Sequence, residues 1–199
     1  YIYMAIRRPM KTPTAGTEVF AAYRGNGASD PGYISGFAVD MGIRNYTTGT
    51  TTMPRMQARL TGGGRSVTST TAAEIADSNA DFDNNNGWFV PNVDSNNYSP
   101  MFKRATGFMD VVAYTGSNGA NITHGLGVVP EMLIVKSRTS GSYDWHTYHK
   151  AMGNNYELRL NQANGTNVIG TTTIWNTTTP TASVFSVLNN AAVNGNATE

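Results

Sequence analysis

The stretch Gln57-Ala58-Arg59-Leu60 recurs as Glu157-Leu158-Arg159-Leu160, and this self-similarity decides how the chain is organised. Three further pairs of stretches match, with offsets that drift between 91 and 96 residues. These pairs are residues 22–25 with 113–116, 37–44 with 131–138, and 4–8 with 100–104. Slowly drifting offsets are typical of duplicated units with loop insertions. The sequence therefore predicts one module copied in tandem.

The repeat has an unusual frame, because a closing strand comes first. Residues 1–8 match the strand that closes the first unit, around residues 98–104. We therefore expect residues 1–11 to be the closing strand of a preceding repeat, 12–105 to be the first β-sandwich unit, and 106–199 to be a second unit that lacks its own closing strand. A missing strand leaves backbone N–H and C=O groups unpaired. We expect the first eight residues to pair within the chain or across a subunit boundary and so cover that edge.

The composition favours strands and turns over helices. Thr, Asn, Gly and Ser dominate the polar residues; Thr is β-branched, whereas Asn and Gly tolerate the positive φ of tight turns. Short apolar or alternating runs at residues 110–114, 132–136, 143–149 and 183–188 are separated by turn clusters. The one helix signal is the capping-box spacing over residues 71–74. We predict an all-β fold of tandem antiparallel β-sandwich units, jelly-roll and lectin-like, with little or no helix.

Charge and cysteine usage exclude several classes of protein. Charged residues make up 14% of the chain and the net charge is +1, which gives no electrostatic footprint for nucleic acid or an anionic membrane. There is no cysteine, so neither disulfides nor thiolate chemistry are available. No apolar run approaches the roughly 20 residues that span a bilayer. We expect no nucleic-acid partner and no membrane insertion.

The reactive side chains form no catalytic motif. His146 and His149 are three residues apart on a predicted strand, which points them to opposite faces, and His124 lies in a turn-like stretch. Residues 116–119 fall one residue short of the G-x-S-x-G nucleophile motif. Carboxylates brought together from distant parts of the chain are the remaining route to glycoside hydrolysis. We predict that the protein is not an enzyme, with a glycan depolymerase as the alternative.

Aromatic residues beside polar ones suggest a glycan-binding site. The rings of Trp145 and Trp88 could stack on sugar rings, while Asp144, His146 and Tyr148 could hydrogen-bond to sugar hydroxyls. The alternative is that the tryptophans fill the cores of the sandwiches. Both interpretations stay open at this point.

One acidic stretch resembles a calcium loop. Asp81, Asp83 and Asn85 have the spacing of the first three ligands of such a loop, but Asn86 stands where its glycine is needed and no Glu closes it. The alternative is a solvated turn that leads into Trp88. We expect no cofactor, apart from a structural calcium ion if these three residues do bind one.

Four stretches of the chain resemble a repeat found in marine phage tail-fibre and virion structural proteins, of the cyanophage and pelagiphage kind. They are residues 107–116, 123–138, 145–149 and 173–185. The resemblance is strongest over residues 107–188 and implies a concanavalin A-like, lectin-type sandwich. It implies a virion role and transfers no catalytic residues.

These observations predict a phage virion structural protein, a tail fibre or receptor-binding segment with possible glycan binding. Its partners would be other copies of itself, other virion proteins and a host surface glycan. It would be made in the host cytoplasm and end up in the tail or surface fibre of the virion. The alternatives are a stand-alone carbohydrate-binding, lectin-like module and a polysaccharide-degrading tailspike.

Overall fold

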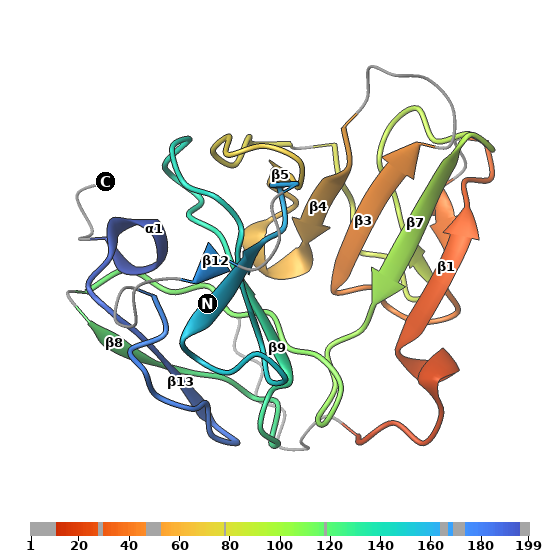
Figure 1. Cartoon of the computed structure of the whole chain (residues 1–199). Coiled ribbons are helices and arrows are strands. Elements are labelled where there is room, and N and C mark those ends of the chain that lie inside the picture. The colour runs from red at the N-terminus through yellow and green to blue at the C-terminus, as the bar shows by residue number, and fades with distance from the viewer. Residues whose placement is uncertain are drawn as a thin grey trace, which may run out of the picture.

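A computed structural model describes residues 11–27, 30–46, 53–77, 79–117, 119–163, 167–168 and 174–195. The predicted closing strand at residues 1–8 lies outside these ranges. The described strands form two groups that lie side by side (Figure 1). The early strands make one group and the later strands make the other, as the colour change along the chain shows.

The first group is built around a five-stranded antiparallel sheet with the order β1-β7-β3-β4-β5. A two-stranded ribbon of β2 and β6 accompanies it. The elements are η1 (Gly16–Glu18), β1 (Phe20–Arg24), β2 (Tyr33–Ile34), β3 (Met41–Tyr46), β4 (Arg55–Ala58), η2 (Arg59–Thr61), β5 (Arg65–Val67), β6 (Gly87–Trp88) and β7 (Asn97–Phe102).

The second group contains a four-stranded antiparallel sheet with the order β12-β11-β10-β9 and a two-stranded sheet of β13 and β8. A single turn of α-helix follows the last strand. The elements are β8 (Ala120–Thr123), β9 (Met132–Val135), β10 (His146–His149), β11 (Tyr156–Arg159), β12 (Asn167–Val168), β13 (Val184–Val187) and α1 (Ala191–Asn194).

The prediction of an all-β, antiparallel fold is confirmed. Within the described ranges α1 is the single α-helix, and no helix there is long and apolar enough to cross a membrane. The capping-box stretch forms no helix, because Ile75 pairs with Arg65 as an isolated bridge and the Glu74 N–H donates to the Arg138 carbonyl. The predicted strand at residues 110–114 is wrong, since that segment is irregular.

Buried hydrophobic side chains form two separate clusters. One draws its members from residues 21–101, with Trp88 at its centre, stacked between Tyr33 and Phe82. The other draws its buried members from residues 122–193 and is centred on Trp175 and Phe185. The division of the chain at residue 105 stays a prediction, but these clusters are what two sandwich units require. We call the parts of the molecule around them the first and the second unit.

The matching tetrapeptides occupy equivalent positions in the two units. Gln57 on β4 and Glu157 on β11 are 2% and 0% exposed, while Leu60 and Leu160 are half exposed. The neighbouring strands do not follow the predicted pairing of stretches 37–44 and 131–138. β4 lies between β3 and β5, and β11 lies between β10 and β12. Because β3 and β10 are the neighbours that precede the matching strands in the chain, the counterpart of β3 is β10 rather than β9.

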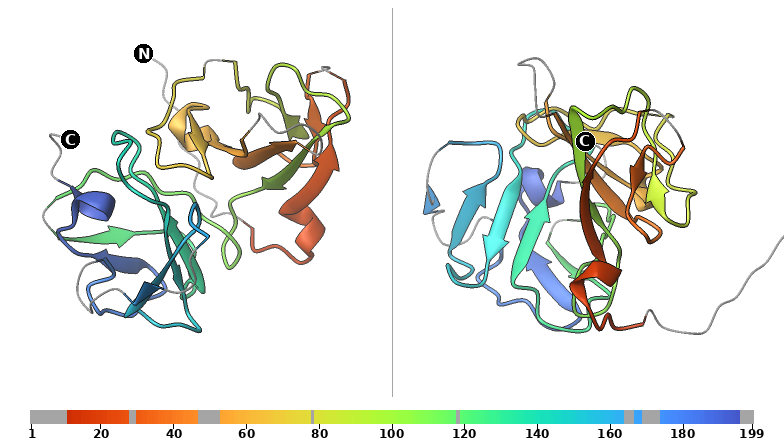
Figure 2. Two further views of the ribbon diagram at one scale, coloured as in Figure 1. Left: turned by 45° about the horizontal axis from the view of Figure 1, so that its top comes forward. Right: turned by 90° about the vertical axis from the view of Figure 1, so that its right-hand side faces the viewer.

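The units meet through a few directed contacts. The Trp145 indole N–H of the second unit donates to the carbonyls of Val67 and Thr70 in the first, each at 3.1 Å. The Arg138 guanidinium makes two hydrogen bonds to the Glu74 carboxylate, at 3.0 and 2.6 Å. Both contacts lie where the loop around β5 meets the segment between β9 and β10 (Figure 2).

Candidate functional site

A groove of about 560 Å³ lies where the two units meet. One wall comes from β3 and β4, a second from the loop after β5, and a third from β9 and the end of β11. The described residues that line it are Ile43, Asn45, Pro54, Met56, Thr68, Ser69, Ile134, Leu160, Asn161 and Gln162. Residues from both units are therefore required to form it.

The wall from the first unit follows from strand alternation. Gly42 faces the core, where a Cβ would overlap the Trp88 indole, and Arg44 also turns inward, where its Nε donates to Asn97 at 2.9 Å. Ile43 and Asn45 therefore face outward, on the side of the groove. Met56 lies opposite Ile43 on the neighbouring strand and continues this wall.

Trp145 positions the loop wall. Its indole N–H is hydrogen-bonded to the carbonyls that flank Thr68 and Ser69 on the chain. The Thr68 N–H also donates to the Pro54 carbonyl at 3.0 Å. The two hydroxyl-bearing residues are thus held on both sides, because the backbone that carries them is bonded to each unit.

Asp144 positions the wall from the second unit. Its Oδ1 accepts hydrogen bonds from Asn161 at 2.7 Å and Gln162 at 3.0 Å, and its Oδ2 accepts one from Arg159 at 3.0 Å. Partial burial alone would raise the pKa of Asp144, but these hydrogen bonds and the charges of Arg159 and His146 lower it below the usual value. An ionised Asp144 therefore fixes the two amide side chains at the groove.

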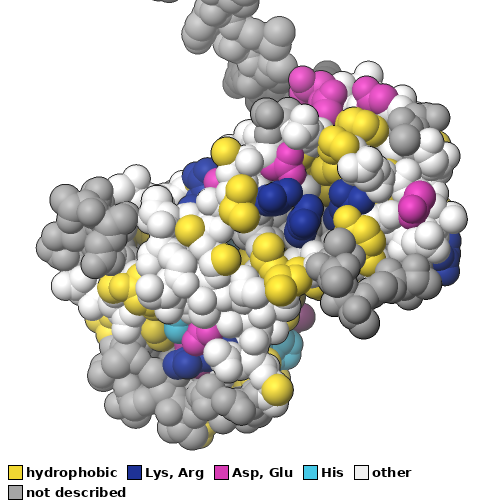
Figure 3. Space-filling model, turned by 90° about the horizontal axis from the view of Figure 1, so that it is seen from above, with side chains coloured by type: hydrophobic (Ala, Val, Ile, Leu, Met, Phe, Trp, Pro, Cys, Tyr) yellow, Lys and Arg dark blue, Asp and Glu magenta, His cyan; other side chains and the backbone are white. Residues whose placement is uncertain are grey.

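The groove suits a neutral polyhydroxylated ligand. Half of its described lining residues offer carbon surface, and the other half carry an amide or a hydroxyl. None of these lining residues is charged. Sugar rings present apolar faces with rims of hydroxyls, which amides and hydroxyls recognise as both donor and acceptor. Seen from above, hydrophobic side chains are scattered over the middle of the molecule, with Lys and Arg side chains close by on the side of the first unit (Figure 3).

The predicted glycan platform at Trp88 and Trp145 is wrong. The two side chains are 0% and 3% exposed, so neither ring has a free face for a sugar. His146 and Tyr148 are also buried, because both belong to the face of β10 that packs on the core of the second unit. Of the predicted set, Asp144 lies near the groove, and it acts there through other residues. The core interpretation holds for Trp88, whereas Trp145 belongs to neither core cluster and is buried at the boundary between the units.

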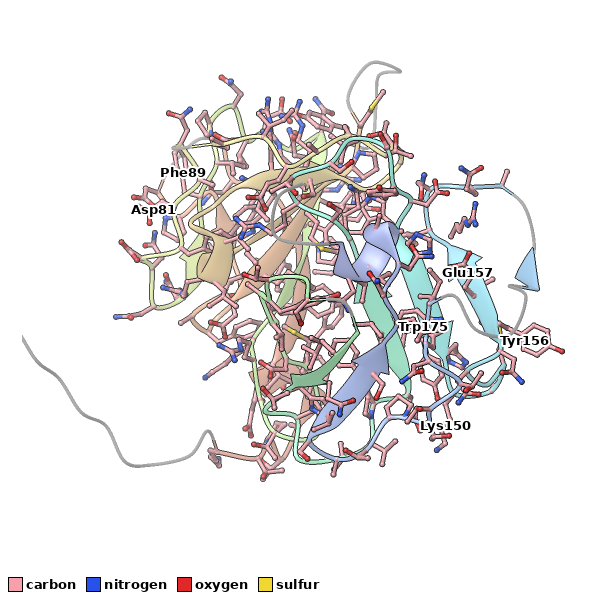
Figure 4. The ribbon with its side chains drawn as sticks, turned by 90° about the vertical axis from the view of Figure 1, so that its left-hand side faces the viewer. Asp81, Phe89, Lys150, Tyr156, Glu157 and Trp175 are labelled. Carbon is pink, nitrogen blue, oxygen red and sulfur yellow. The ribbon has the colours of Figure 1, made fainter. Side chains whose placement is uncertain are left out.

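His146 belongs to a buried charged network. Its Nδ1–H donates to Glu157 Oε2, and Arg159 Nε donates to Glu157 Oε1 at 2.9 Å. Burial alone would raise the pKa of Glu157, but the hydrogen bond and charge of His146 and those of Arg159 lower it. Figure 4 shows Glu157 within the second unit and Tyr156, the preceding residue, pointing away from the sheet. The network shares Arg159 with Asp144 and so joins the core to the groove wall.

The two carboxylates of the acidic stretch have protein partners. Asp81 Oδ1 accepts the Asp83 N–H at 2.6 Å, as in a solvated Asx turn, and its backbone pairs with Phe89 (Figure 4). Asp83 lies 3.6 Å from the Arg59 guanidinium. Among the described residues, no group of three or more His, Asp or Glu side chains could hold a metal ion. The role of Asn85 as a third ligand stays a prediction.

The sequence did not indicate the groove residues. Asn45, Thr68, Ser69, Asn161 and Gln162 come from three separate stretches, and Asn and Thr are common throughout the chain. The one available signal was the matching tetrapeptide, since Leu160 closes its second copy and two lining amides follow directly. Their approach to β3 and β4 depends on how the units pack.

The fold and groove define a class of all-β protein, built of antiparallel sheets, with a candidate binding site between its two units. A family model described as a domain of unknown function (DUF7483) matches residues 76–198, and the chain belongs to this family. The match begins within the predicted first unit, so it includes β6 and β7 with the second unit. No curated protein and no solved structure matches the chain.

Proposed function

We propose that the protein is a non-enzymatic structural and receptor-recognition segment of a phage virion, and that it offers the groove between its units to a neutral surface glycan. The observation that carries the proposal is the uncharged lining of amides, hydroxyls and carbon surface. The resemblance of residues 107–188 to phage fibre repeats supports the virion context. The receptor would be a host surface polysaccharide, and the partners would be further copies of the chain or other virion proteins.

The way the groove is built supports binding rather than catalysis. Its walls are held by directed hydrogen bonds from Trp145 and Asp144, so the site is formed before a ligand arrives. Preformed sites lose less conformational entropy when a ligand binds. The carboxylate that holds the groove wall, Asp144, is engaged by three hydrogen-bond donors. A fibre gains avidity when many copies each bind weakly.

The decisive experiment is a glycan array probed with the whole chain and with a Ser69→Trp variant. Ser69 is an exposed lining residue, so a large ring there should fill the groove without disturbing either core. We expect the chain to bind neutral glycans and the variant to lose at least about tenfold in affinity, which corresponds to about 1.4 kcal/mol.

The matched control is Ser183→Trp, at another exposed serine, one that does not line the groove. It should bind as the unaltered chain does. Equal loss in both variants, or no glycan binding at all, would overturn the proposal. A reducing-end assay on any bound polysaccharide tests the tailspike alternative, and the sedimentation mass tests the monomeric lectin alternative.

A further inference from the structure

The outer face of the five-stranded sheet carries a strip of aromatic side chains. Phe20 on β1 is 41% exposed and Tyr98 on β7 is 37% exposed. Phe102 lies opposite Phe20 on β7, with the two ring centroids 5.2 Å apart, and Tyr98 lies four residues away from Phe102 along the same strand. Large apolar side chains that remain exposed on one surface mark a candidate binding site. We call these three residues the aromatic strip.

The aromatic strip and the groove lie on the same side of this sheet. On β7, the side chains of Asn97, Ser99 and Met101 turn into the core, so Tyr98 and Phe102 turn outward. Tyr98 is paired in register with Asn45, which lines the groove. Residues directly opposite on neighbouring antiparallel strands share a face. The strip therefore begins at Tyr98, beside the groove, and runs along β7 to Phe102 and its partner Phe20 on β1.

This surface has the same uncharged character as the groove. Between Tyr98 and the Phe20–Phe102 pair this face carries Pro100 and Ala22, and Met41 lies opposite Phe102 on β3. The one charged side chain that the described strands β1, β7 and β3 place on this face is Arg24, whose Nη1 donates to the Ser95 carbonyl at 2.6 Å. Flat rings alternate here with small and amide side chains.

We infer that the aromatic strip is a set of additional subsites for a neutral oligosaccharide whose first sugars occupy the groove. This inference rests on the proposed function and deepens it. The apolar face of a sugar ring can stack on Tyr98 and Phe20, while Asn45 beside Tyr98 hydrogen-bonds to hydroxyls. Tyr98 and Phe102 are four residues apart on β7, a separation of about 13 Å at about 3.3 Å per residue, so a ligand that reaches from the groove to Phe20 is a chain of several sugars.

The extent of the strip favours a glycan over a second copy of the chain. A stable protein interface buries about 1,000 Å² or more. Here two rings are more than a third exposed, and Phe102 is half-buried. Because one aromatic side chain buries about 150–250 Å² when it is fully covered, these three partly covered rings by themselves offer well under the area of such an interface, which suits a few stacked sugars better than a second chain.

The test is a length series of neutral oligosaccharides: cello-, malto-, manno- and N-acetylchito-oligomers of two to six sugars. Their affinity is measured by calorimetry for the chain and for Phe20→Ala and Tyr98→Ala. We expect each substitution to weaken binding of the hexasaccharide roughly 3- to 10-fold, as the loss of one aromatic contact predicts. Affinity for the disaccharide should stay unchanged, because it occupies the groove alone.

The control is Tyr23→Ala. Tyr23 is 60% exposed on the same strand but is paired with the inward-facing Ser99, so it lies off the strip. Unchanged hexasaccharide affinity in both strip variants, with binding lost in Ser69→Trp, would overturn the strip and leave the proposed function standing. No binding at any length would overturn both. A fall in sedimentation mass in the strip variants would show that the surface joins copies of the chain and would also overturn the inference.

Discussion

The two units place different polar side chains at the same buried position, and each side chain finds different hydrogen-bond partners there. In the first unit, Gln57 is neutral and donates from Nε2 to the Gly63 carbonyl at 2.8 Å. In the second, Glu157 is buried equally well but is surrounded by His146 and Arg159. The amide of Gln57 is satisfied by one backbone carbonyl, whereas the carboxylate of Glu157 is accompanied by two polar side chains. The comparison teaches that a copied backbone can hold an amide or a charge, provided that the neighbours change with it.

The largest expected effect on stability comes from removing the two buried side chains, Glu157 and Gln57. We expect Glu157→Ala to reduce the free energy of unfolding by about 3 kcal/mol or more, because it leaves the buried His146 Nδ1–H without its acceptor and removes one of the two carboxylates that Arg159 contacts. Gln57→Ala should cost about 1–3 kcal/mol, since it removes a neutral hydrogen bond. Urea denaturation of both variants measures the difference. Equal losses would show that the charge of Glu157 has no special role.

Acid should distinguish the units in the same way. The pKa of Glu157 is lower in the folded protein than its ordinary value of 4.5. Its contribution to stability is therefore fully present above pH 4.5 and is lost as pH falls through the lower, folded value. We expect the second unit to weaken first, and Gln57 contributes no such dependence to the first. Thermal unfolding between pH 7 and 3, for the chain and for Glu157→Gln, tests this; identical slopes would contradict it.

A smaller effect is expected at Trp145, which can be compared with Trp88. Trp88 donates to Ser99 at 3.1 Å within its own unit, whereas Trp145 donates across the boundary. Replacing Trp145 with Phe keeps the ring but removes the bonds to Val67 and Thr70. We expect a loss of about 1–2 kcal/mol together with weaker glycan binding, because the loop wall is released. Trp88→Phe should cost stability and leave binding intact, and binding measured for the two variants checks this.

The smallest effect is expected at the Arg138–Glu74 pair. Arg138 is about half exposed, so solvent screens the interaction. We expect Arg138→Met to cost about 0.2–1 kcal/mol in low salt and less at high salt. A loss of several kcal/mol at both salt concentrations, measured by denaturation, would show that this pair carries far more of the contact between the units than its exposure implies.

The fold class and the equivalence of the tetrapeptides could be predicted from sequence, but most strand partners and the site could not. Thr, Asn and Gly make strands and turns likely in any arrangement, so composition reached the all-β class. The sequence matched the stretch that contains β3 to the one that contains β9 instead of to β10, because short strands resemble one another in sequence. Trp145 was predicted to be a ligand platform. The alternating sequence around it is the same whether the ring faces solvent or another unit, so sequence could not distinguish the two.

The sequence by itself determined local preferences: antiparallel strands, turns at Gly and Asn, and buried positions that recur at Gln57 and Glu157. Only the tertiary structure decided that residues from β3, β4, β9 and the end of β11 meet in one groove. It also decided that Trp145 and Asp144 hold the lining segments in place by hydrogen bonds without lining the groove themselves. The physical reason is that strand alternation is set by neighbours in the chain, whereas which faces meet depends on the packing of whole sheets.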